Sequence, residues 1–309
     1  MLSLKLRMIM NHFVRNIVVV VSVGTALQAT ALAADIVPLT FINELPVIEV
    51  TVGAVSSRLM IDSGGSLGIS IPETTVRKSG SVTLVDQKTK FSDLSGHVYE
   101  VQNLVAKQIV VGSTRLGAVE GRFHVQWGGA PEGPNAELTK AREAGAIGLA
   151  AFGNRPVMLD YHLGSFSIFG PGEGPQAGQQ GWRALHLEYG KEGPNVTLIV
   201  NGKPHKFVFD TGTPVNLVNA ESLVLPIAKN QCQGPITDKL DCDPRELGQV
   251  QDANGGSLGK LAAERVNLKG APFEGLLGAP FFHRYRVLFD LSGHRLLISP
   301  FDAKLNNIP

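Results

Sequence analysis

The sequence has few of the features that indicate a metal site, a nucleic-acid partner or an integral membrane protein. It contains only two cysteines in 309 residues, and its formal net charge is +1. A near-neutral charge gives no support to nucleic-acid binding or to a charged membrane surface. The histidines show no metal-ligand spacing, and there is no His-Glu-x-x-His motif. Helical patterns are few, whereas the 35 glycines are typical of a turn-rich β protein.

Only one long apolar run is present, and it lies near the N-terminus. Lys5, Arg7 and Arg15 form a basic start, residues 17–29 are mostly apolar, and Ala31-Leu32-Ala33 fits a small-x-small cleavage site. The run is shorter than the roughly 20 residues that span a bilayer. It therefore predicts a signal peptide over residues 1–33. An uncleaved anchor is the alternative. After cleavage we expect a periplasmic or secreted protein without stable membrane insertion.

Both cysteines, Cys232 and Cys242, fall in one polar stretch of the second half of the chain. An exported protein meets an oxidising compartment, so the favoured interpretation is a local disulfide bond that pins a loop. Two free thiols are the alternative, and a metal site is not favoured because no histidine lies near them in sequence.

An internal repeat is the most informative feature of the chain. Residues 59–64 (LMIDSG) recur in kind as residues 207–212 (FVFDTG), so each copy ends an apolar run in Asp, a small hydroxyl residue and Gly. A proline stands 16 residues before each Asp, at Pro46 and Pro194. Between the proline and the Asp each copy reads as strand, turn and strand, with a strong hairpin signal at Asn201-Gly202.

A second matched block closes each half of the repeat. Gly148 follows two apolar residues and precedes Asp160 by 12 positions, and Gly278 precedes Asp290 by the same count. Asp160 and Asp290 each end an apolar strand before a turn, so we expect structural roles for both. Two blocks in the same order with the same internal spacing indicate a duplicated domain.

The duplication divides the chain into a first lobe at residues 34–169, a Gly/Pro/Gln-rich linker at 170–181 and a second lobe at 182–309. The first lobe has 18 more residues between its two motifs, which we assign to a surface excursion at about residues 127–143; a loop over the site is the alternative. A helix is predicted at residues 137–143 and a short turn at 221–224. Strands are predicted at residues 47–52, 58–61, 98–105, 108–111, 157–159, 166–169, 196–200, 207–209, 266–268, 286–289 and 296–299.

The paired motifs resemble those of the aspartic proteases, both the two-lobed pepsin-like and the retropepsin-like enzymes, over about residues 37–302. The resemblance implies an all-β, bilobal acid-protease fold built from two β-barrel-like lobes related by a pseudo-twofold axis. It also implies that Asp62 and Asp210 meet and share one proton, because two close carboxylates cannot both ionise cheaply. The pair would then activate a water without a metal or an organic cofactor.

The resemblance assigns supporting roles to the residues around each Asp. Ser63 and Thr211 match the position whose hydroxyl ties the two loops together. Gly64 and Gly212 allow tight turns that bring backbone amides near the carboxylates. Thr213 matches a position whose hydroxyl bonds the catalytic carboxylate.

Three further features follow from the same resemblance. Gly148 and Gly278 match the segments that thread beside the Asp loops in a psi structure. The first lobe has Gly65 where the second has a hydroxyl residue, with Ser66 as a candidate substitute, so we expect Asp62 to be the harder of the two to deprotonate. Tyr99 lies where the family places a flap tyrosine, and residues 254–257 stand at a comparable place in the second lobe; a half-buried strand tyrosine is the alternative.

The resemblance and the signal peptide predict an exported monomer that acts as an aspartic-type endopeptidase on peptides or unfolded proteins, in a cleft that favours apolar side chains. The alternative is a catalytically silent relative that binds peptides without cleaving them. A different class of enzyme is suggested by residues 64–68 and 255–259, which both fit Gly-x-Ser-x-Gly, the nucleophile elbow of α/β-hydrolases. The elbow requires a long helix after it, and no helical pattern follows either copy.

Overall fold

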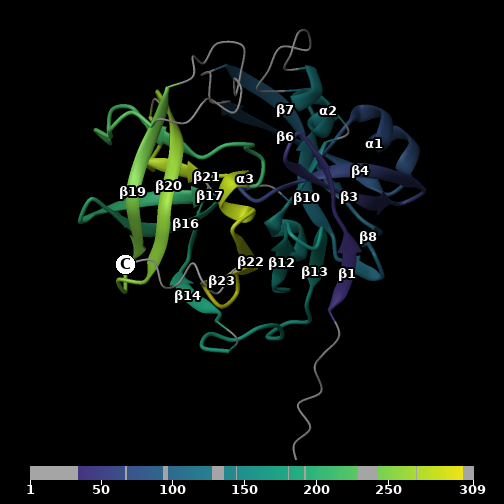
Figure 1. Ribbon diagram of the computed structural model, residues 1–309. Coiled ribbons are helices and arrows are strands. Elements are labelled where there is room, and N and C mark those ends of the chain that lie inside the picture. The colour runs from purple at the N-terminus through teal and green to yellow at the C-terminus, as the bar shows by residue number, and fades with distance from the viewer. Residues whose placement is uncertain are drawn as a thin grey trace, which may run out of the picture. The chain divides into compact units, whose positions relative to one another are not determined.

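The computed structural model describes residues 34–66, 68–92, 97–126, 136–143, 145–179, 181–190, 193–228, 243–268 and 270–301 (Figure 1). All of them belong to one compact unit, Leu32–Pro309. The predicted signal peptide and the two cysteines, Cys232 and Cys242, lie outside the described residues, so cleavage and the disulfide stay predictions. Among the helices of the described part, none has the length and apolar character needed to cross a membrane.

The first lobe is built on a ten-stranded sheet with a few short helices. Its strands are β2 (Thr40–Ile42), β3 (Leu45–Val52), β4 (Val55–Asp62), β5 (Ile69–Ile71), β6 (Val82–Ser92), β7 (Val98–Ala106), β8 (Ile109–Val111), β9 (Thr114–Leu116), β10 (Val119–Phe123) and β11 (Ala146–Gly148). Its helices are α1 (Glu73–Ser79), α2 (Ala136–Glu143) and the 3₁₀ turn η1 (Leu149–Phe152).

The second lobe is built on a seven-stranded sheet. Its elements are β15 (Glu188–Gly190), β16 (Gly193–Val200), β17 (Lys203–Phe209), β18 (Leu217–Asn219), β19 (Pro244–Asp252), β20 (Ser257–Val266), β21 (Gly275–Leu277) and α3 (Ala279–Phe282). Strand β19 pairs with β20 on one side and with β16 on the other, so the sheet closes on itself as a barrel. The long β19–β20 hairpin is the green pair of strands in Figure 1.

A third sheet of six strands is shared by the two halves of the chain. Its members, in sheet order, are β1 (Asp35–Pro38), β13 (Ser165–Ile168), β12 (Val157–Asp160), β22 (Tyr285–Asp290), β23 (Arg295–Pro300) and β14 (Arg183–His186). The antiparallel pair β12–β22 joins the halves at the centre, and the strands on either side repeat the same order. The sheet therefore has pseudo-twofold symmetry, as expected for duplicated halves.

The same symmetry relates the sheets of the two lobes. Strand β11 runs parallel to β4, with Gly148 opposite Asp62, and β21 runs parallel to β17, with Leu277 opposite Phe209. Strands β5 and β18 flank these pairs on the other side, followed by the parallel partners β10 and β20. The predicted all-β, bilobal fold is confirmed. The predicted hairpin is also confirmed, because Asn201 and Gly202 join β16 to β17 with positive φ angles of 52° and 74°.

The strand pairing corrects one comparison between the lobes. Because β20 matches β10 and β19 matches β7, the turn at residues 253–256 corresponds to the connection between β7 and β10. It does not correspond to the β6–β7 hairpin that carries Tyr99. In the first lobe, the chain between β7 and β10 forms the β8–β9 hairpin.

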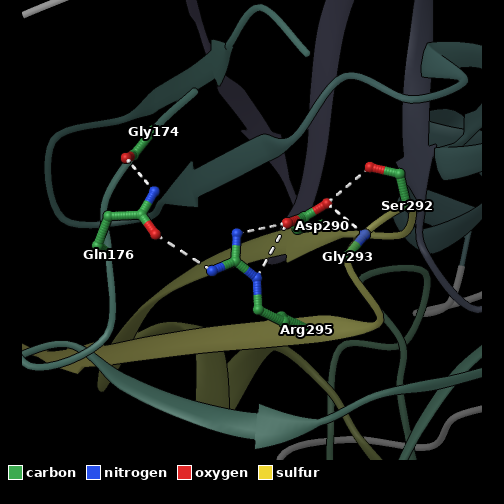
Figure 2. Close-up of polar contacts among 6 residues, drawn as sticks. All are labelled: Gly174, Gln176, Asp290, Ser292, Gly293 and Arg295. Carbon is green, nitrogen blue, oxygen red and sulfur yellow. Dashed lines mark hydrogen bonds and ion pairs between the residues drawn. The ribbon is translucent and has the colours of Figure 1, made fainter. Parts of the chain in front are cut away.

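The predicted linker is attached to the six-stranded sheet by side chains (Figure 2). Asp290, at the end of β22, accepts hydrogen bonds from the hydroxyl of Ser292 at 3.0 Å and the amide of Gly293 at 2.8 Å, and it pairs with Arg295 at 2.6 Å. The same guanidinium donates to Oε1 of Gln176 in the linker at 3.2 Å. These contacts give Asp290 the structural role that its position predicts. Asp160 has a similar one, since its carboxylate accepts from the amide of Leu163 at 2.8 Å.

Candidate active site

Asp62 and Asp210 each stand at the end of a buried strand of their own lobe. The residues just before them, Ile61 and Phe209, are fully buried, which fixes the backbone from which each carboxylate projects. Each Asp residue is only half-buried, so part of it remains exposed to solvent. Strands β4 and β17 thus act as rigid supports for two accessible acidic groups.

Ser63 and Thr211 connect the two Asp loops through a reciprocal set of hydrogen bonds. The amide of Ser63 donates to Oγ1 of Thr211 at 3.0 Å, and the amide of Thr211 donates to Oγ of Ser63 at 2.9 Å. Each hydroxyl also donates to a carbonyl across the interface, Ser63 to Phe209 at 2.7 Å and Thr211 to Ile61 at 2.7 Å. Both hydroxyl residues are fully buried. The loops are therefore held at a fixed separation, as the sequence predicted.

The two carboxylates approach a common point beside Gly212. A Cβ atom added at Gly212 would lie 3.0 Å from Oδ1 of Asp210 and 3.1 Å from Oδ1 of Asp62. The separation between the two Oδ1 atoms is therefore at most the sum of these two distances. One water that makes a hydrogen bond of ~2.8 Å to each oxygen spans about the same separation. The duplicated motifs bring their acidic groups together.

Glycine is required in the first Asp loop because the opposite carboxylate packs directly on it. A Cβ atom at Gly64 would lie 2.4 Å from Cγ of Asp210 and 2.6 Å from its Oδ1, closer than real contacts allow. In the second loop, the amide of Gly212 donates to Oδ1 of Asp210 at 2.8 Å. The sequence predicted that these glycines let the backbone turn tightly and bring amides near the carboxylates, and both effects are seen here.

The pKa of each carboxyl is raised above the ordinary value of an Asp, and the causes differ. Burial and then the charge of Asp62 raise the pKa of Asp210 to about 7. Burial also raises the pKa of Asp62, but the charges of Arg142 and Arg122 oppose that rise. The expectation that Asp62 is the harder of the two to deprotonate counted local hydroxyl donors and did not include these two arginines, which favour the ionised form of Asp62.

The absent hydroxyl at Gly65 is replaced by backbone donors. The amides of Gly65 and Gly64 hydrogen-bond to the carboxylate of Asp62 and favour its ionised form. Ser66 is exposed, and within the described residues its side chain makes no hydrogen bond to the site. The candidate substitution by Ser66 is therefore not what the structure uses.

Arg142 comes from the extra segment of the first lobe, which the sequence assigned to a surface excursion. Its side chain is only 6% exposed, and its Nη2 donates to the carbonyl of Gly212 at 3.0 Å. Its charge lowers the pKa of both Asp62 and Asp210. The end of helix α2 thus contacts the site, which corrects the surface assignment for this helix; residues 127–135 lie outside the described part. The helix itself was predicted correctly at residues 137–143.

Tyr99 lies on the β6–β7 hairpin, directly across from Phe91 and close to the hairpin tip. The two rings stack with centroids 5.1 Å apart, and Cζ of Arg122 lies 3.6 Å from the centroid of Phe91. Arg122 in turn acts electrostatically on Asp62. Ring and cation contacts therefore lead from Tyr99 to Arg122, and the charge of Arg122 acts on Asp62. The tip itself, residues 93–96, lies outside the described residues, and the flap role of Tyr99 stays a prediction.

Two tyrosines accompany the carboxylates and were missed by sequence reasoning. Burial and the charge of Asp62 raise the pKa of Tyr189, and burial and the charge of Asp210 raise that of Tyr161. Each hydroxyl oxygen is buried and has no hydrogen-bond partner among the described residues. Isolated tyrosines after or within short strands carry no sequence signal of this placement.

Thr213 supports the second loop in a different way from the one predicted. Its hydroxyl donates to the carbonyl of Val215 at 3.2 Å, not to the carboxylate of Asp210. Its backbone carbonyl accepts from the amide of Ala279 at 3.1 Å. The neighbouring Gly278 packs so closely that an added Cβ would lie 2.5 Å from the carbonyl oxygen of Thr213. Thr213 thus joins the loop to the segment that begins α3.

The amides of the two psi-segment glycines each donate a hydrogen bond, to a backbone carbonyl in the first lobe and to a side chain in the second. The amide of Gly148 donates to the carbonyl of Gly68 at 2.8 Å, and that of Gly278 donates to Oδ1 of Asn216 at 2.9 Å. Asn216 also donates from Nδ2 to the carbonyl of Ala262 at 2.9 Å. In both lobes the segment is thereby fixed beside its Asp loop, as the sequence predicted.

The nucleophile-elbow alternative does not agree with the local structure. Strand β5 follows residues 64–68, and strand β20 begins at Ser257 inside the second copy. Neither copy is followed by the helix that the elbow needs. Within the described ranges, no group of three or more His, Cys, Asp or Glu side chains is arranged to hold a metal ion.

Comparison with known proteins gives no independent identification. The sequence matches no protein-family model, and a search of curated proteins returns no match. The geometry of the site therefore carries the functional argument.

Proposed function

We propose that the protein is an exported aspartic-type endopeptidase that hydrolyses peptide bonds in peptides or unfolded proteins. The observation that carries the proposal is the convergence of Asp62 and Asp210 at Gly212, across loops locked by Ser63 and Thr211. Both carboxylates are half-buried and are placed to contact one water, and Asp210 has a raised pKa of about 7. Such a pair is suited to general acid–base hydrolysis.

We assign a role to each carboxylate from the raised pKa of Asp210, about 7, which makes Asp210 the member that carries the proton. Asp62 is the ionised base and takes a proton from the water, whose oxygen bonds to the substrate carbonyl carbon. Asp210 is the protonated member and gives its proton to the carbonyl oxygen. The resulting diol collapses when Asp62 passes its proton to the amide nitrogen, the C–N bond breaks, and Asp210 recovers a proton from one hydroxyl. Both carboxyl groups are then ready for another water.

Digestion of an unfolded, carboxymethylated protein at pH 3, 5 and 7 tests the proposal, with new peptide termini detected by mass spectrometry. Wild-type protein is expected to cleave, and a statine-type inhibitor is expected to block cleavage. Asp62→Asn and Asp210→Asn should each lower the rate by on the order of 10²–10⁴, the usual contribution of a positioned acid or base. Asp86→Asn, at an exposed position in β6, is the control and should cleave normally.

Two results would contradict hydrolysis by the acidic pair. One is cleavage that survives in both site variants, and the other is the absence of cleavage by wild-type protein. If wild-type protein binds peptides without cleaving them, and both variants bind equally well, the alternative of a non-cleaving peptide-binding module is correct.

A further inference from the structure

Arg122 places an unneutralised cation between the hairpin that carries Tyr99 and the acidic pair. Its side chain projects from β10, its guanidinium covers the ring of Phe91 at 3.6 Å, and its charge acts on Asp62. It is half-buried. Its guanidinium donates no hydrogen bond to any of the described residues, whereas most guanidinium groups in proteins pair with a carboxylate or a carbonyl.

Over the described residues, the charges that act on Asp62 do not balance without another anion. Arg142 and Arg122 bring two positive charges to Asp62. With Asp210 protonated, the acidic pair supplies one negative charge. Arg142 is positioned by its bond to the carbonyl of Gly212, which leaves the Arg122 guanidinium as the group able to meet a ligand. A half-buried cation held 3.6 Å from the centroid of an aromatic ring is preorganised for a planar carboxylate, with which it can form two parallel hydrogen bonds.

We propose that Arg122 makes the site selective for substrates that carry a carboxylate close to the scissile bond. This inference rests on the proposed function for its location in a substrate cleft. Two sources supply the same chemistry: the side chain of an Asp or Glu residue of the substrate, and the C-terminal carboxylate of a peptide. The first would make the enzyme selective for acidic sequences, and the second would direct it to chain ends.

Peptide affinity tests the inference separately from catalysis. The probes are acetylated, amidated eight-residue peptides of Ala, Leu and Phe, with a single Glu moved through every position. Matched peptides carry Gln instead, and a third set is neutral with a free C-terminal carboxylate. Dissociation constants are measured by calorimetry with the full protein bearing Asp210→Asn, so that no probe is consumed. Hydrolysis by wild-type protein is followed in parallel.

We expect at least one Glu peptide, or the free-carboxylate set, to bind about tenfold more tightly than its neutral match, as one charge-assisted pair allows. Arg122→Met should abolish this ratio, and Arg122→Glu should invert it. Arg115→Met, an exposed arginine of β9, removes the same charge elsewhere and should keep the ratio. The set that shows the preference identifies the source of the carboxylate.

The inference is overturned if charged and neutral probes bind equally, if none binds, or if the preference survives in Arg122→Met. Failure of the proposed function looks different. In that case wild-type protein cleaves no probe, while the preference for the carboxylate and its dependence on Arg122 are still measured.

Discussion

Ser63 and Thr211 exchange hydrogen bonds across the lobe interface, each amide donating to the other residue's hydroxyl, at 3.0 and 2.9 Å. Each hydroxyl also donates to the carbonyl of the residue two positions before the opposite hydroxyl residue, so both hydroxyl groups are used as donor and acceptor. The positions of Asp62 and Asp210 depend on these four bonds, because each carboxylate is adjacent in sequence to one of the two residues.

Thr211→Val is expected to destabilise the protein by about 1–3 kcal/mol, the cost of leaving buried polar groups without partners. The substitution keeps the side-chain shape but leaves the Ser63 amide and the Ile61 carbonyl unpaired. Thermal and urea unfolding measure the loss. Ser66→Ala, which removes an exposed hydroxyl from the same loop, is the control and should change stability by less than about 0.5 kcal/mol. Equal effects of the two substitutions would show that the reciprocal bonds do not hold the loops.

Gly64→Ala is expected to cause a large loss of peptide cleavage and a smaller loss of thermal stability. The new methyl group would lie 2.4 Å from Cγ of Asp210, so the carboxylate must move away from Asp62. A displacement of about 1 Å at a reacting group can cost on the order of 100-fold in rate. Peptide cleavage and thermal unfolding are measured together. Gly117→Ala is matched to it, since an added Cβ there meets no atom within 4 Å, and it should leave both properties unchanged. Normal cleavage by Gly64→Ala would contradict the close packing of the two loops.

Arg142→Met should move the pH profile of cleavage to higher pH. The arginine lowers the pKa of both Asp62 and Asp210, so its removal raises both. The acid limb, which follows ionisation of Asp62, and the alkaline limb, which follows loss of the Asp210 proton, should therefore both shift upward. Measurement of kcat/KM from pH 3 to 9 tests this. Arg142→Lys keeps a positive charge and should shift the limbs less; a profile that stays unchanged in Arg142→Met would rule out this electrostatic role.

Asp210→Asn should become more stable relative to wild type as the pH rises from about 4 to about 7. The unfolded carboxyl has an ordinary pKa of about 3.9, and the folded one has a pKa raised to about 7. The folded protein thus binds the extra proton, and the stability that this proton gives is complete below the unfolded pKa and is lost as pH rises through the folded pKa. The amide cannot ionise, so it avoids that loss.

The measurement is the difference in Tm between Asp210→Asn and wild type at closely spaced pH values. We expect the difference to grow by about 2 °C or more across this window and to level off above it, since a change of 1 kcal/mol corresponds to roughly 2–4 °C in a protein of this size. Asp86→Asn, at an exposed site, should give a constant difference. A constant difference for Asp210→Asn as well would mean that its carboxyl is not protonated in the folded protein near neutral pH.

The parts of the site that lie within the duplicated motifs could be predicted from the sequence. An apolar run before each Asp, a small hydroxyl residue after it and a glycine at a matched distance are local signals, and each is repeated. The structure accordingly brings together Asp62, Asp210, Ser63 and Thr211. Repetition made a weak motif informative, because the two copies constrain one another.

Other elements gave no local signal. Strands β5 and β18 have three residues each, too few for a period of two to be recognised. Strand β6 is long, yet almost all its residues are exposed or half-buried, so it lacks the alternation of a strand with one face in the core. A hairpin that stands away from the core is stabilised by its partner strand, which the sequence of one strand alone does not reveal.

The arginines show why the electrostatics of the acidic pair could not be predicted. Arg142 lies in a short polar helix, where an arginine is usually solvated, and it donates to the carbonyl of Gly212, 70 residues away. Arg122 ends a strand whose partners are β7 and β5. Their effect on Asp62 is a sum of charges brought together by the fold, so local motifs carry no information about it.

The central claim is that Asp62 and Asp210 hold one proton between them, and a carboxyl titration tests it most directly. Wild-type protein labelled with ¹³C at the aspartate carboxyl groups is followed by NMR from pH 2 to 9, with Asp62→Asn and Asp210→Asn used to assign the two signals. We expect the Asp210 carboxyl to titrate with a pKa of about 7 and to become more acidic in Asp62→Asn, because the neighbouring charge is lost. If both carboxyls titrate independently near pH 4, and neither responds to substitution of the other, the two groups do not share a proton and the account is wrong.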